Sequence, residues 1–294
     1  MKMTQRVPLT WSDFSALRWS GIEKPASRIG KLKLQQYAEK HGFACPKILG
    51  RFDSASKIKL DSVNADAFVL KAEGLWSSEG VYVLHKIMGL HLFYDVKSQR
   101  VVSEEQIVQS ALELEAKRNK KINFFIEQRV VDEEAKNIIP LDYKLFTFYD
   151  RVEFILQVDR NYTPARFCFF DGQFNVIKDD RVQASSHAQQ PAAIPRVPEC
   201  ADQMLRLATD LTKKLKATFI SVDCYATPDG AVLGELTHTP GGPWFQRMYY
   251  FSDSFELELG RYWRLAYQKL QQDIPLLTVP HEVKLKGKVC RVIY

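Results

Sequence analysis

Apolar residues repeat at helical spacing in four stretches of the chain, and each stretch predicts an amphipathic helix. The first runs from about residue 27 to 41, with Ser27 as its N-cap and Gly42 as its C-terminal stop. The second opens on the capping box Ser103-Glu104-Glu105-Gln106. The apolar positions of the last three helices are Ile107, Ala111 and Leu114; Met204, Ala208, Leu211 and Leu215; and Leu259, Tyr262, Ala266 and Leu270.

Eight shorter runs have the composition of β-strands, because they are rich in β-branched and aromatic residues and are bounded by Gly, Asp, Asn or Pro. They cover residues 67–72, 81–87, 122–128, 143–148, 152–158, 166–170, 218–225 and 231–237. Several follow one another with no helix between them, which predicts antiparallel sheet and an α+β fold. The stretch 179–198, interrupted by prolines and rich in Ala, Ser and Gln, predicts a long loop.

The composition is that of an ordinary globular protein. The 294 residues are 46% hydrophobic and 26% charged, and 18 Phe, 12 Tyr and 5 Trp exclude an intrinsically disordered chain. No run approaches the roughly 18 apolar residues of a membrane-spanning helix. Residues 1–6 lead into no signal-peptide core, so we expect no membrane insertion and a cytoplasmic location. The five cysteines form no CxxC pair and the six histidines form no HExxH motif, which predicts reduced thiols and no zinc site.

The net charge of +6 is a moderate excess and does not indicate a nucleic-acid-binding protein. The densest basic run, Lys117-Arg118-Asn119-Lys120-Lys121, falls at the end of the second predicted helix, where cations complement the helix dipole. The positive balance is compatible with a small anionic ligand such as a nucleotide.

Lys71 stands near the end of the predicted strand 67–72, and a loop flanked by Gly74 and Gly80 connects it to the next strand. A lysine on a strand has a fixed stem, so its ammonium group can be held against phosphate oxygens. A flexible loop can fold backbone N–H groups over the same anion. The alternative is an ordinary β-hairpin with a surface lysine, because the run is neither a Walker A nor a GxGxxG sequence.

Two acidic residues, Asp223 and Glu235, fall on predicted strands that the turn Asp229-Gly230 joins into a hairpin. The surrounding positions are otherwise apolar, and an unpaired carboxylate is costly to bury there. Two carboxylates that converge across a hairpin suit a divalent cation with oxygen ligands, and Mg²⁺ shared with a nucleotide is a common case. The alternative is that each acid pairs with a lysine or an arginine.

A third region contains Glu127 at the end of the strand 122–128 and Lys144 at the start of the strand 143–148. A strand that runs into a linker exposes backbone N–H and C=O groups that can bind an adenine edge. Lys144 places a second amine at a strand start. The alternative is an edge strand protected by its charges.

Taken in order, these regions resemble the ATP-grasp superfamily, and most closely its TupA-like branch, named for teichuronopeptide biosynthesis. The matching stretches lie within residues 27–245 and are FVLKAEGLWSSEGVYVL, FIEQRVV, DYKLFTF and SVDCYATPDGAVLGELTHTPGG. The resemblance implies an α+β ATP-grasp fold in which two α+β lobes clamp ATP. It implies an N-terminal substrate region at 1–66, a small lobe at 67–130 and a large lobe with the metal site at 131–294.

The resemblance also implies roles for particular residues. Lys71, Lys144 and Lys31 are similar to lysines that bind the ATP phosphates, and the loop Gly74–Gly80 is similar to the flap over them. The adenosine would be held by Glu127, Glu134 and the backbone of the residues after Glu127. The implied ATP-binding set is Lys31, Lys71, Gly74, Ser77, Ser78, Gly80, Glu127, Gln128, Val130, Glu134 and Lys144, and the implied Mg²⁺ ligands are Asp223, Glu235 and Thr237.

Two positions depart from the pattern of related ligases. Thr237 stands where many have Asn, and a hydroxyl is a weaker or water-mediated metal ligand, although Glu-Leu-Thr resembles the TupA-like pattern itself. Ser221 stands where many have Arg. The arginine that steadies the transferred phosphoryl group therefore comes from elsewhere, with Arg160 and Arg166 as candidates, or is absent.

The function implied by the resemblance is that of an ATP- and Mg²⁺-dependent carboxylate–amine ligase, which forms an amide through an acyl phosphate. Such a reaction needs no protein nucleophile, and the chain shows no Ser-His-Asp or Cys-His pattern. The implied product is an amino-acylated uronic acid or peptide on a surface polysaccharide, or a peptide natural product. Two alternatives stay open: a phosphotransferase acting on a sugar or another hydroxyl, and a non-catalytic nucleotide-binding protein. The sequence identifies neither the carboxylate, the amine nor the oligomeric state.

Overall fold

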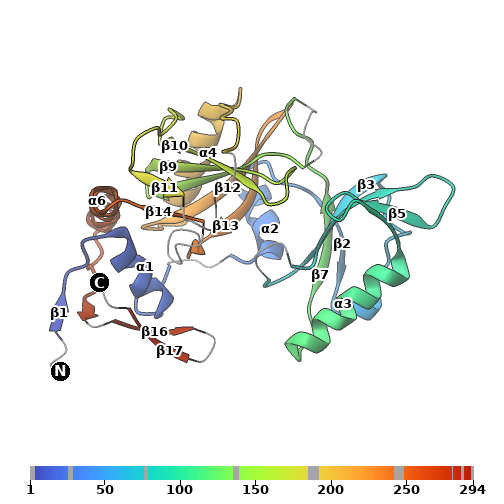
Figure 1. Cartoon of the computed structure of the whole chain (residues 1–294), viewed down its shortest axis with the longest axis horizontal. Helices are drawn as coiled ribbons and strands as arrows, with labels where there is room; N and C mark the ends of the chain where they lie inside the picture. The colour runs from blue at the N-terminus through green and yellow to red at the C-terminus, as the bar shows by residue number, and fades with distance from the viewer. Residues whose placement is uncertain are drawn as a thin grey trace. The chain divides into compact units, whose positions relative to one another are not determined.

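The computed structural model describes residues 4–25, 29–75, 79–134, 139–184, 192–241, 248–279, 281–285 and 288–292 (Figure 1). The chain divides into two compact units. Unit 1 contains Met1–Arg28, Leu141–Cys224 and Leu236–Tyr294, and unit 2 contains Ile29–Pro140 and Tyr225–Glu235. Helices and antiparallel strands occur in both, which confirms the predicted α+β fold. The domain boundaries at residues 66 and 130 stay a prediction.

Unit 2 is built on a six-stranded antiparallel sheet with the strand order β2-β7-β3-β4-β5-β6. The strands are β2 (Ile48–Phe52), β3 (Ala67–Ala72), β4 (Val81–Lys86), β5 (Leu92–Asp95), β6 (Arg100–Ser103) and β7 (Phe124–Gln128). Helix α3 (Glu104–Arg118) runs along one face of this sheet in Figure 1. Helix α2 (Lys31–His41) and the 3₁₀ helix η1 (Ala55–Lys57) also belong to the unit.

Helix α3 begins and ends where its sequence predicts. Ser103 accepts a hydrogen bond from the Gln106 backbone N–H, and the Gln106 side chain accepts one from the Ser103 N–H. The helix ends at Asn119, which is left-handed, so Lys117 and Arg118 lie in the last turn. The predicted apolar stripe is buried in one cluster with alternate residues of the strands, namely Ile107, Ala111, Leu114, Phe68, Leu70, Leu84, Phe93, Phe124 and Ile126. Because strand side chains alternate, Lys71 and Glu127 lie on the other face of the sheet.

A five-stranded sheet has the strand order β10-β9-β8-β12-β13; β8, β9, β10 and the part of β12 up to Cys224 belong to unit 1, whereas Tyr225–Glu235 belong to unit 2. The sheet's strands are β8 (Asp142–Phe148), β9 (Arg151–Asp159), β10 (Arg166–Asp171), β12 (Ile220–Thr227) and β13 (Gly230–Thr237). The last two are joined by the turn residues Pro228 and Asp229, one position before the predicted Asp229-Gly230 turn. The helices of unit 1 are α1 (Trp11–Trp19), α4 (Ala201–Lys214) and α6 (Asp253–Lys269). Three two-stranded pairs are formed by β1 (Thr4–Arg6) with β15 (Leu277–Val279), β11 (Val182–Ala184) with β14 (Tyr249–Phe251), and β16 (His281–Leu285) with β17 (Lys288–Val292).

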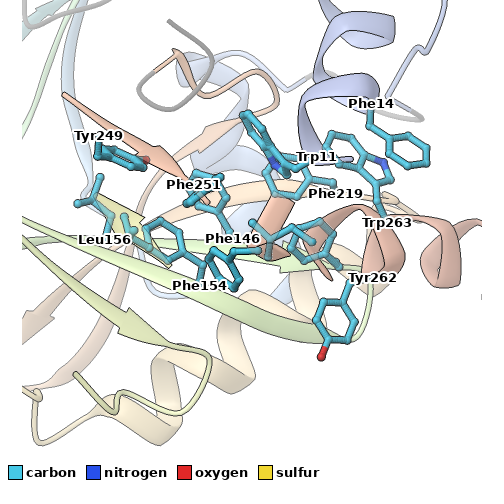
Figure 2. Close-up of a cluster of buried hydrophobic side chains, with 14 of the residues drawn as sticks. Trp11, Phe14, Phe146, Phe154, Leu156, Phe219, Tyr249, Phe251, Tyr262 and Trp263 are labelled. Carbon is cyan, nitrogen blue, oxygen red and sulfur yellow. The ribbon is translucent and has the colours of Figure 1, made fainter. Parts of the chain in front are cut away.

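An aromatic core joins the N-terminal helix of unit 1 to its sheet and to α6 (Figure 2). Phe14 stacks on Trp263, with ring centroids 5.0 Å apart and planes 10° from parallel. Trp11 meets Phe251 and Phe219 edge to face at 5.7 and 6.2 Å. Large buried rings contribute most of the hydrophobic stabilisation of such a core, so α1 is an integral part of unit 1.

Two helix predictions differ from the structure. Helix α1 was not predicted, because almost every residue from Trp11 to Arg18 is buried and no polar face marks a helical period. Its signal was the capping box of Thr10 and Asp13. Helix α2 starts at Lys31 with Gly30 as its N-cap, so the predicted start near residue 27 is wrong; Ser27 itself lies outside the described residues. Gly42 ends the helix in the left-handed conformation, as predicted.

The predicted loop 179–198 contains the short strand β11, and its residues 185–191 lie outside the described part of the chain. Within the described residues, no helix combines the length and apolarity that spanning a membrane requires. Cys45, Cys168, Cys200 and Cys224 are free thiols, in agreement with the prediction for these four residues.

Candidate functional site

Lys144 lies between two carboxylates of unit 1. It is the third residue of β8, which is the neighbour of β12 in the sheet. Its ammonium group pairs with Asp223 Oδ2 on β12 and lies 3.0 Å from Asp142 Oδ2 on its own strand. Asp142 and Lys144 are two residues apart and therefore on the same face of β8. The Lys144 side chain is 23% exposed, whereas both carboxylates are 5% exposed.

The charges of this cluster compensate one another. Asp142 also accepts a hydrogen bond of 2.7 Å from Arg160 Nη1, and Ser221 Oγ donates to Asp223 Oδ1 at 3.1 Å. Burial disfavours the charged form of Lys144, but Asp142 and Asp223 outweigh burial and raise the pKa of its ammonium group. Burial likewise opposes ionisation of Asp142, but Lys144 and Arg160 lower its pKa. Asp142 and Lys144 are therefore both charged at neutral pH.

Lys71 of unit 2 pairs with Glu127 on the sheet face opposite α3. Lys71 is on β3 and Glu127 on the adjacent strand β7, where Glu127 stands opposite Val69. The two side chains are 18% and 11% exposed. Lys71 is therefore not the surface lysine of an ordinary hairpin.

Lys31, the first residue of α2, contacts Glu235. Its Nζ lies 3.4 Å from Glu235 Oε1 and 3.5 Å from the carbonyl oxygen of Leu75. The Glu235 side chain is 42% exposed, whereas that of Asp223 is 5% exposed. The two predicted metal carboxylates stand on adjacent strands, but each pairs with its own lysine in the structure, the alternative left open above.

A glycine stands at each end of the loop between β3 and β4, at Gly74 and at Gly80. Both glycines are left-handed, with φ of +71° and +68°, and a Cβ on Gly80 would lie 2.7 Å from Ala72 Cβ. Glu79 pairs with Arg118 and, at 3.2 Å, with Lys117, so the basic end of α3 contacts this loop. Ser77 and Ser78 lie outside the described residues.

The other predicted residues are described by their own contacts and burial. The Gln128 N–H donates to the Lys47 carbonyl at 2.8 Å, and the Glu134 N–H donates to Asp132 at 3.3 Å. The Arg166 guanidinium lies 3.5 Å from the centroid of the Tyr162 ring. Val130 and Thr237 are half-buried, with Thr237 ending β13.

The predicted Mg²⁺ ligands fit that ion in their chemistry. Asp223, Glu235 and Thr237 offer oxygen atoms alone, and Mg²⁺ typically takes one or two carboxylates together with substrate phosphates. Asp223 is buried, and its side chain offers carboxylate oxygens of the kind that Mg²⁺ prefers. Across the described residues there is no group of three or more His, Cys, Asp or Glu side chains that could hold a metal ion.

Sequence reasoning missed Asp142 and Glu79. The signal for Asp142 was local, because an acid and a lysine two residues apart on a buried strand share one face. No local pattern relates Glu79 to Arg118, which is 39 positions away.

Three solved structures are similar to this chain at low identity. The D-alanine–D-alanine ligase of Helicobacter pylori is 18% identical with a TM-score of 0.43, over 79% of this chain and 57% of that one. The ATP complex of the Bacillus anthracis D-alanine–D-alanine ligase is 12% identical with a TM-score of 0.45, over 82% and 67%. The ATP-grasp ligase PsnB, in complex with its minimal precursor, Mg and ADP, is 11% identical with a TM-score of 0.42, over 82% and 59%.

The match thus covers between 57% and 67% of these solved chains. A comparison with curated proteins gave no match. The sequence model of the family described as TupA-like ATPgrasp matches residues 34–264, a range that contains Lys71, Lys144 and Asp223. The chain therefore belongs to the TupA-like ATP-grasp family.

Proposed function

We propose that this chain is an ATP- and Mg²⁺-dependent ligase that joins a carboxylate to an amine. The observation that carries the proposal is the Lys144–Asp223 pair, found in a member of the ATP-grasp superfamily. A lysine ammonium group suits phosphate oxygens, and a carboxylate suits Mg²⁺. The pair thus brings together, in one buried cluster, the two kinds of group that Mg-ATP requires.

The proposed reaction has two steps. A carboxylate oxygen attacks the γ-phosphorus of ATP, the bond from that phosphorus to the β,γ-bridging oxygen breaks, and ADP leaves an acyl phosphate. The uncharged amine then attacks the acyl carbon, the carbon–oxygen bond to phosphate breaks, and the amide, inorganic phosphate and a proton result. Catalysis of this kind rests on positioning and charge stabilisation, so it uses cations and not a protein nucleophile.

Each predicted residue has a role in this proposal. Lys71, Lys144 and Lys31 bind phosphate oxygens, and Arg160 or Arg166 steadies the transferred phosphoryl group. Mg²⁺, when bound, neutralises phosphate charge, and its ligands are Asp223, Glu235 and Thr237. The remaining residues bind adenosine or cover the phosphates, namely Gly74, Ser77, Ser78, Gly80, Glu127, Gln128, Val130 and Glu134.

The substrates we propose are a small-molecule or glycan carboxylate and an amine acceptor. The product is an amide in surface polysaccharide or peptide natural-product biosynthesis, made in the cytoplasm. The support for this pathway is the family relationship alone.

The test is a screen of amino acids and uronic acids, in which ADP and inorganic phosphate are measured with carboxylate, amine or both present. We expect full phosphate release only with both, and the amide detected by mass spectrometry. Lys144→Gln should abolish the signal. Lys269→Gln is the matched control, because Lys269 pairs with Asp150 at 2.8 Å in the same unit, and it should retain the signal.

Two results would overturn the proposal that the chain is a ligase. A phosphorylated hydroxyl compound without amide would identify a phosphotransferase. A melting temperature that saturating Mg-ATP does not raise would leave a non-catalytic protein, because a ligand at 100 times its Kd adds about 2.7 kcal/mol of stability.

A further inference from the structure

Asp142 is a buried carboxylate that forms ion pairs with two basic side chains, those of Lys144 and Arg160. One of its oxygens, Oδ2, lies 3.0 Å from Lys144 Nζ and 2.7 Å from Arg160 Nη1. Its side chain is 5% exposed, whereas those of Lys144 and Arg160 are 23% and 36% exposed. Asp142 is thus more deeply buried than either cation that it contacts. Its other oxygen, Oδ1, is buried with no hydrogen-bond partner within the described part of the chain.

The backbone around Asp142 is fixed on both sides. Strand β8 lies between β9 and β12 in the sheet, and Asp142 stands opposite Val158 while Lys144 stands opposite Leu156. The lysine side chain, in contrast, has a long flexible stem with a rotamer entropy of about 2 kcal/mol. A carboxylate on a rigid strand is the kind of group that confines such an ammonium group to one place.

The charges run in sequence from Arg160 through Asp142 and Lys144 to Asp223, with alternating signs. A cation bound to Asp223 would compete with Lys144 for that carboxylate and would repel the ammonium group. Asp142 would then be the carboxylate that still compensates Lys144. A lysine left without a nearby carboxylate would be free to leave the site, because its stem is long and flexible.

We propose that Asp142 is a positioning residue that keeps Lys144, together with Arg160, at the phosphate groups of the bound nucleotide. The inference rests on the proposed function, since it requires ATP to bind at Lys144. Asp142 acts through the two cations and does not itself touch the nucleotide. Loss of its charge therefore weakens binding of the phosphates and leaves binding of adenosine unchanged.

The experiment is a double-mutant cycle on the full chain, with affinities for Mg-ATP and adenosine measured by calorimetry. The variants are Asp142→Asn, Lys144→Gln and their combination. We expect Asp142→Asn to lower the affinity for Mg-ATP by about tenfold, the effect of losing a charge-assisted hydrogen bond. The same variant should leave the affinity for adenosine unchanged. In the Lys144→Gln background it should lower the affinity for Mg-ATP little further, because the effects of substitutions at interacting residues do not add. Asp13→Asn is the control: Asp13 is also buried and pairs with an arginine, Arg6, at 2.7 Å, and this variant should bind ATP like the wild type.

Three outcomes would overturn the inference. The first is an Asp142→Asn effect of the same size with and without Lys144, and the second is an equal loss of ATP and adenosine affinity. In either case wild-type binding of Mg-ATP would leave the proposed function standing, whereas a wild-type chain that binds no ATP would end both. Asp142→Glu, which keeps the charge and moves the carboxylate by one methylene, serves if Asp142→Asn fails to fold. Wild-type ATP affinity in that folded variant is the third outcome against the inference.

Discussion

Lys144 and Asp223, 79 positions apart in the chain, form an ion pair between the adjacent strands β8 and β12. The pair joins the residue proposed to bind phosphate to the residue proposed to bind magnesium. In this arrangement Lys144 forms an ion pair with the carboxylate that a metal ion would need as its ligand. We therefore expect binding of the nucleotide and of the metal to be coupled, because phosphate oxygens that attract Lys144 would free Asp223 for the cation.

Replacement of Lys144 should raise the affinity for a divalent cation in the absence of nucleotide. The Lys144→Gln variant removes the competing ammonium group, and we expect Mn²⁺, used as a spectroscopic probe for Mg²⁺, to bind about tenfold more tightly. Electron paramagnetic resonance of free Mn²⁺ measures this affinity directly. With ATP present the same variant should bind the metal–nucleotide complex more weakly, because a phosphate contact is lost.

Two variants delimit this prediction. Asp223→Asn should abolish the gain when combined with Lys144→Gln, because the carboxylate that takes the metal is gone. Lys269→Gln, which breaks the Lys269–Asp150 pair of the same unit, should leave Mn²⁺ affinity unchanged. A Lys144→Gln variant that binds Mn²⁺ no better than the wild type would contradict the coupling.

Gly80 should tolerate alanine much less well than Gly74, although both are left-handed. A Cβ on Gly80 would lie 2.7 Å from Ala72 Cβ and 3.1 Å from Leu114 Cδ2, whereas a Cβ on Gly74 meets nothing within 4 Å. Gly74→Ala should therefore lower the free energy of unfolding by about 1 kcal/mol, the strain of a left-handed residue. Gly80→Ala adds overpacking of roughly 1–3 kcal/mol. Urea denaturation of the two variants measures the difference, and equal losses would disprove the close packing at Gly80.

Much of the fold was predictable, since the relevant signals are local. The strand 67–72 was predicted with its observed bounds, and α3 with its capping box, because alternation and caps act over a few residues. The strands that were not predicted are β1, β2, β5, β6, β11, β14, β15, β16 and β17. Four of them, β1, β11, β14 and β15, have three residues each, too few to show a period. Helix α1 was missed for a different reason, since a helix buried on almost every side has no polar face.

The candidate site was predictable as a set of residue types but not as a set of contacts. The sequence marks Lys144, Asp223 and Glu235 as charges on strands of apolar character. It does not indicate that Lys144 pairs with Asp223 or that Lys31 pairs with Glu235. Such pairs depend on the order of strands in the sheet and on the placement of α2, which the local pattern does not specify.

The buried pair of Arg18 and Glu23 should contribute strongly to the stability of unit 1. Glu23 accepts two hydrogen bonds from Arg18 and one of 3.1 Å each from Thr218 and Tyr267. The Arg18 guanidinium lies 4.7 Å from the centroid of Trp263. Because Glu23→Gln leaves a buried arginine without its counter-charge, we expect a loss of about 3 kcal/mol or more in the free energy of unfolding.

Chemical denaturation followed by tryptophan fluorescence measures this loss. The comparison variant is Lys57→Gln, which breaks the exposed pair of Lys57 and Asp53, and it should leave the unfolding midpoint unchanged because exposed pairs are weak. A Glu23→Gln midpoint as high as that of Lys57→Gln would show that the buried pair does not stabilise the unit.

Glu256 should make the stability of unit 1 depend on pH. Its carboxylate accepts hydrogen bonds of 2.8 Å from the N–H and from the hydroxyl of Ser12, in the first turn of α1. Burial raises the pKa of the Glu256 carboxyl to about 7, although the hydrogen bonds from Ser12 lower it. The negative charges of Asp13 and Asp253 raise it further. The folded chain therefore binds a proton more tightly than the unfolded chain does. This contribution to stability is present below the ordinary carboxyl pKa of about 4.3 and is lost as the pH rises to about 7.

The Glu256→Gln variant tests this sign. The amide keeps an acceptor for Ser12 and carries no charge, so we expect the variant to be more stable than the wild type at about pH 8, by of order 2 kcal/mol, and not at about pH 4. Urea denaturation across this pH range measures how the free energy of unfolding of the wild type and of the variant changes with pH. Glu258→Gln, which removes another carboxylate of α6, should keep the wild-type decline between these pH values. A Glu256→Gln variant that is less stable than the wild type at high pH would mean that the ionised carboxylate stabilises the start of α1. The favourable interaction of an anion with a helix N-terminus would then outweigh the burial of its charge.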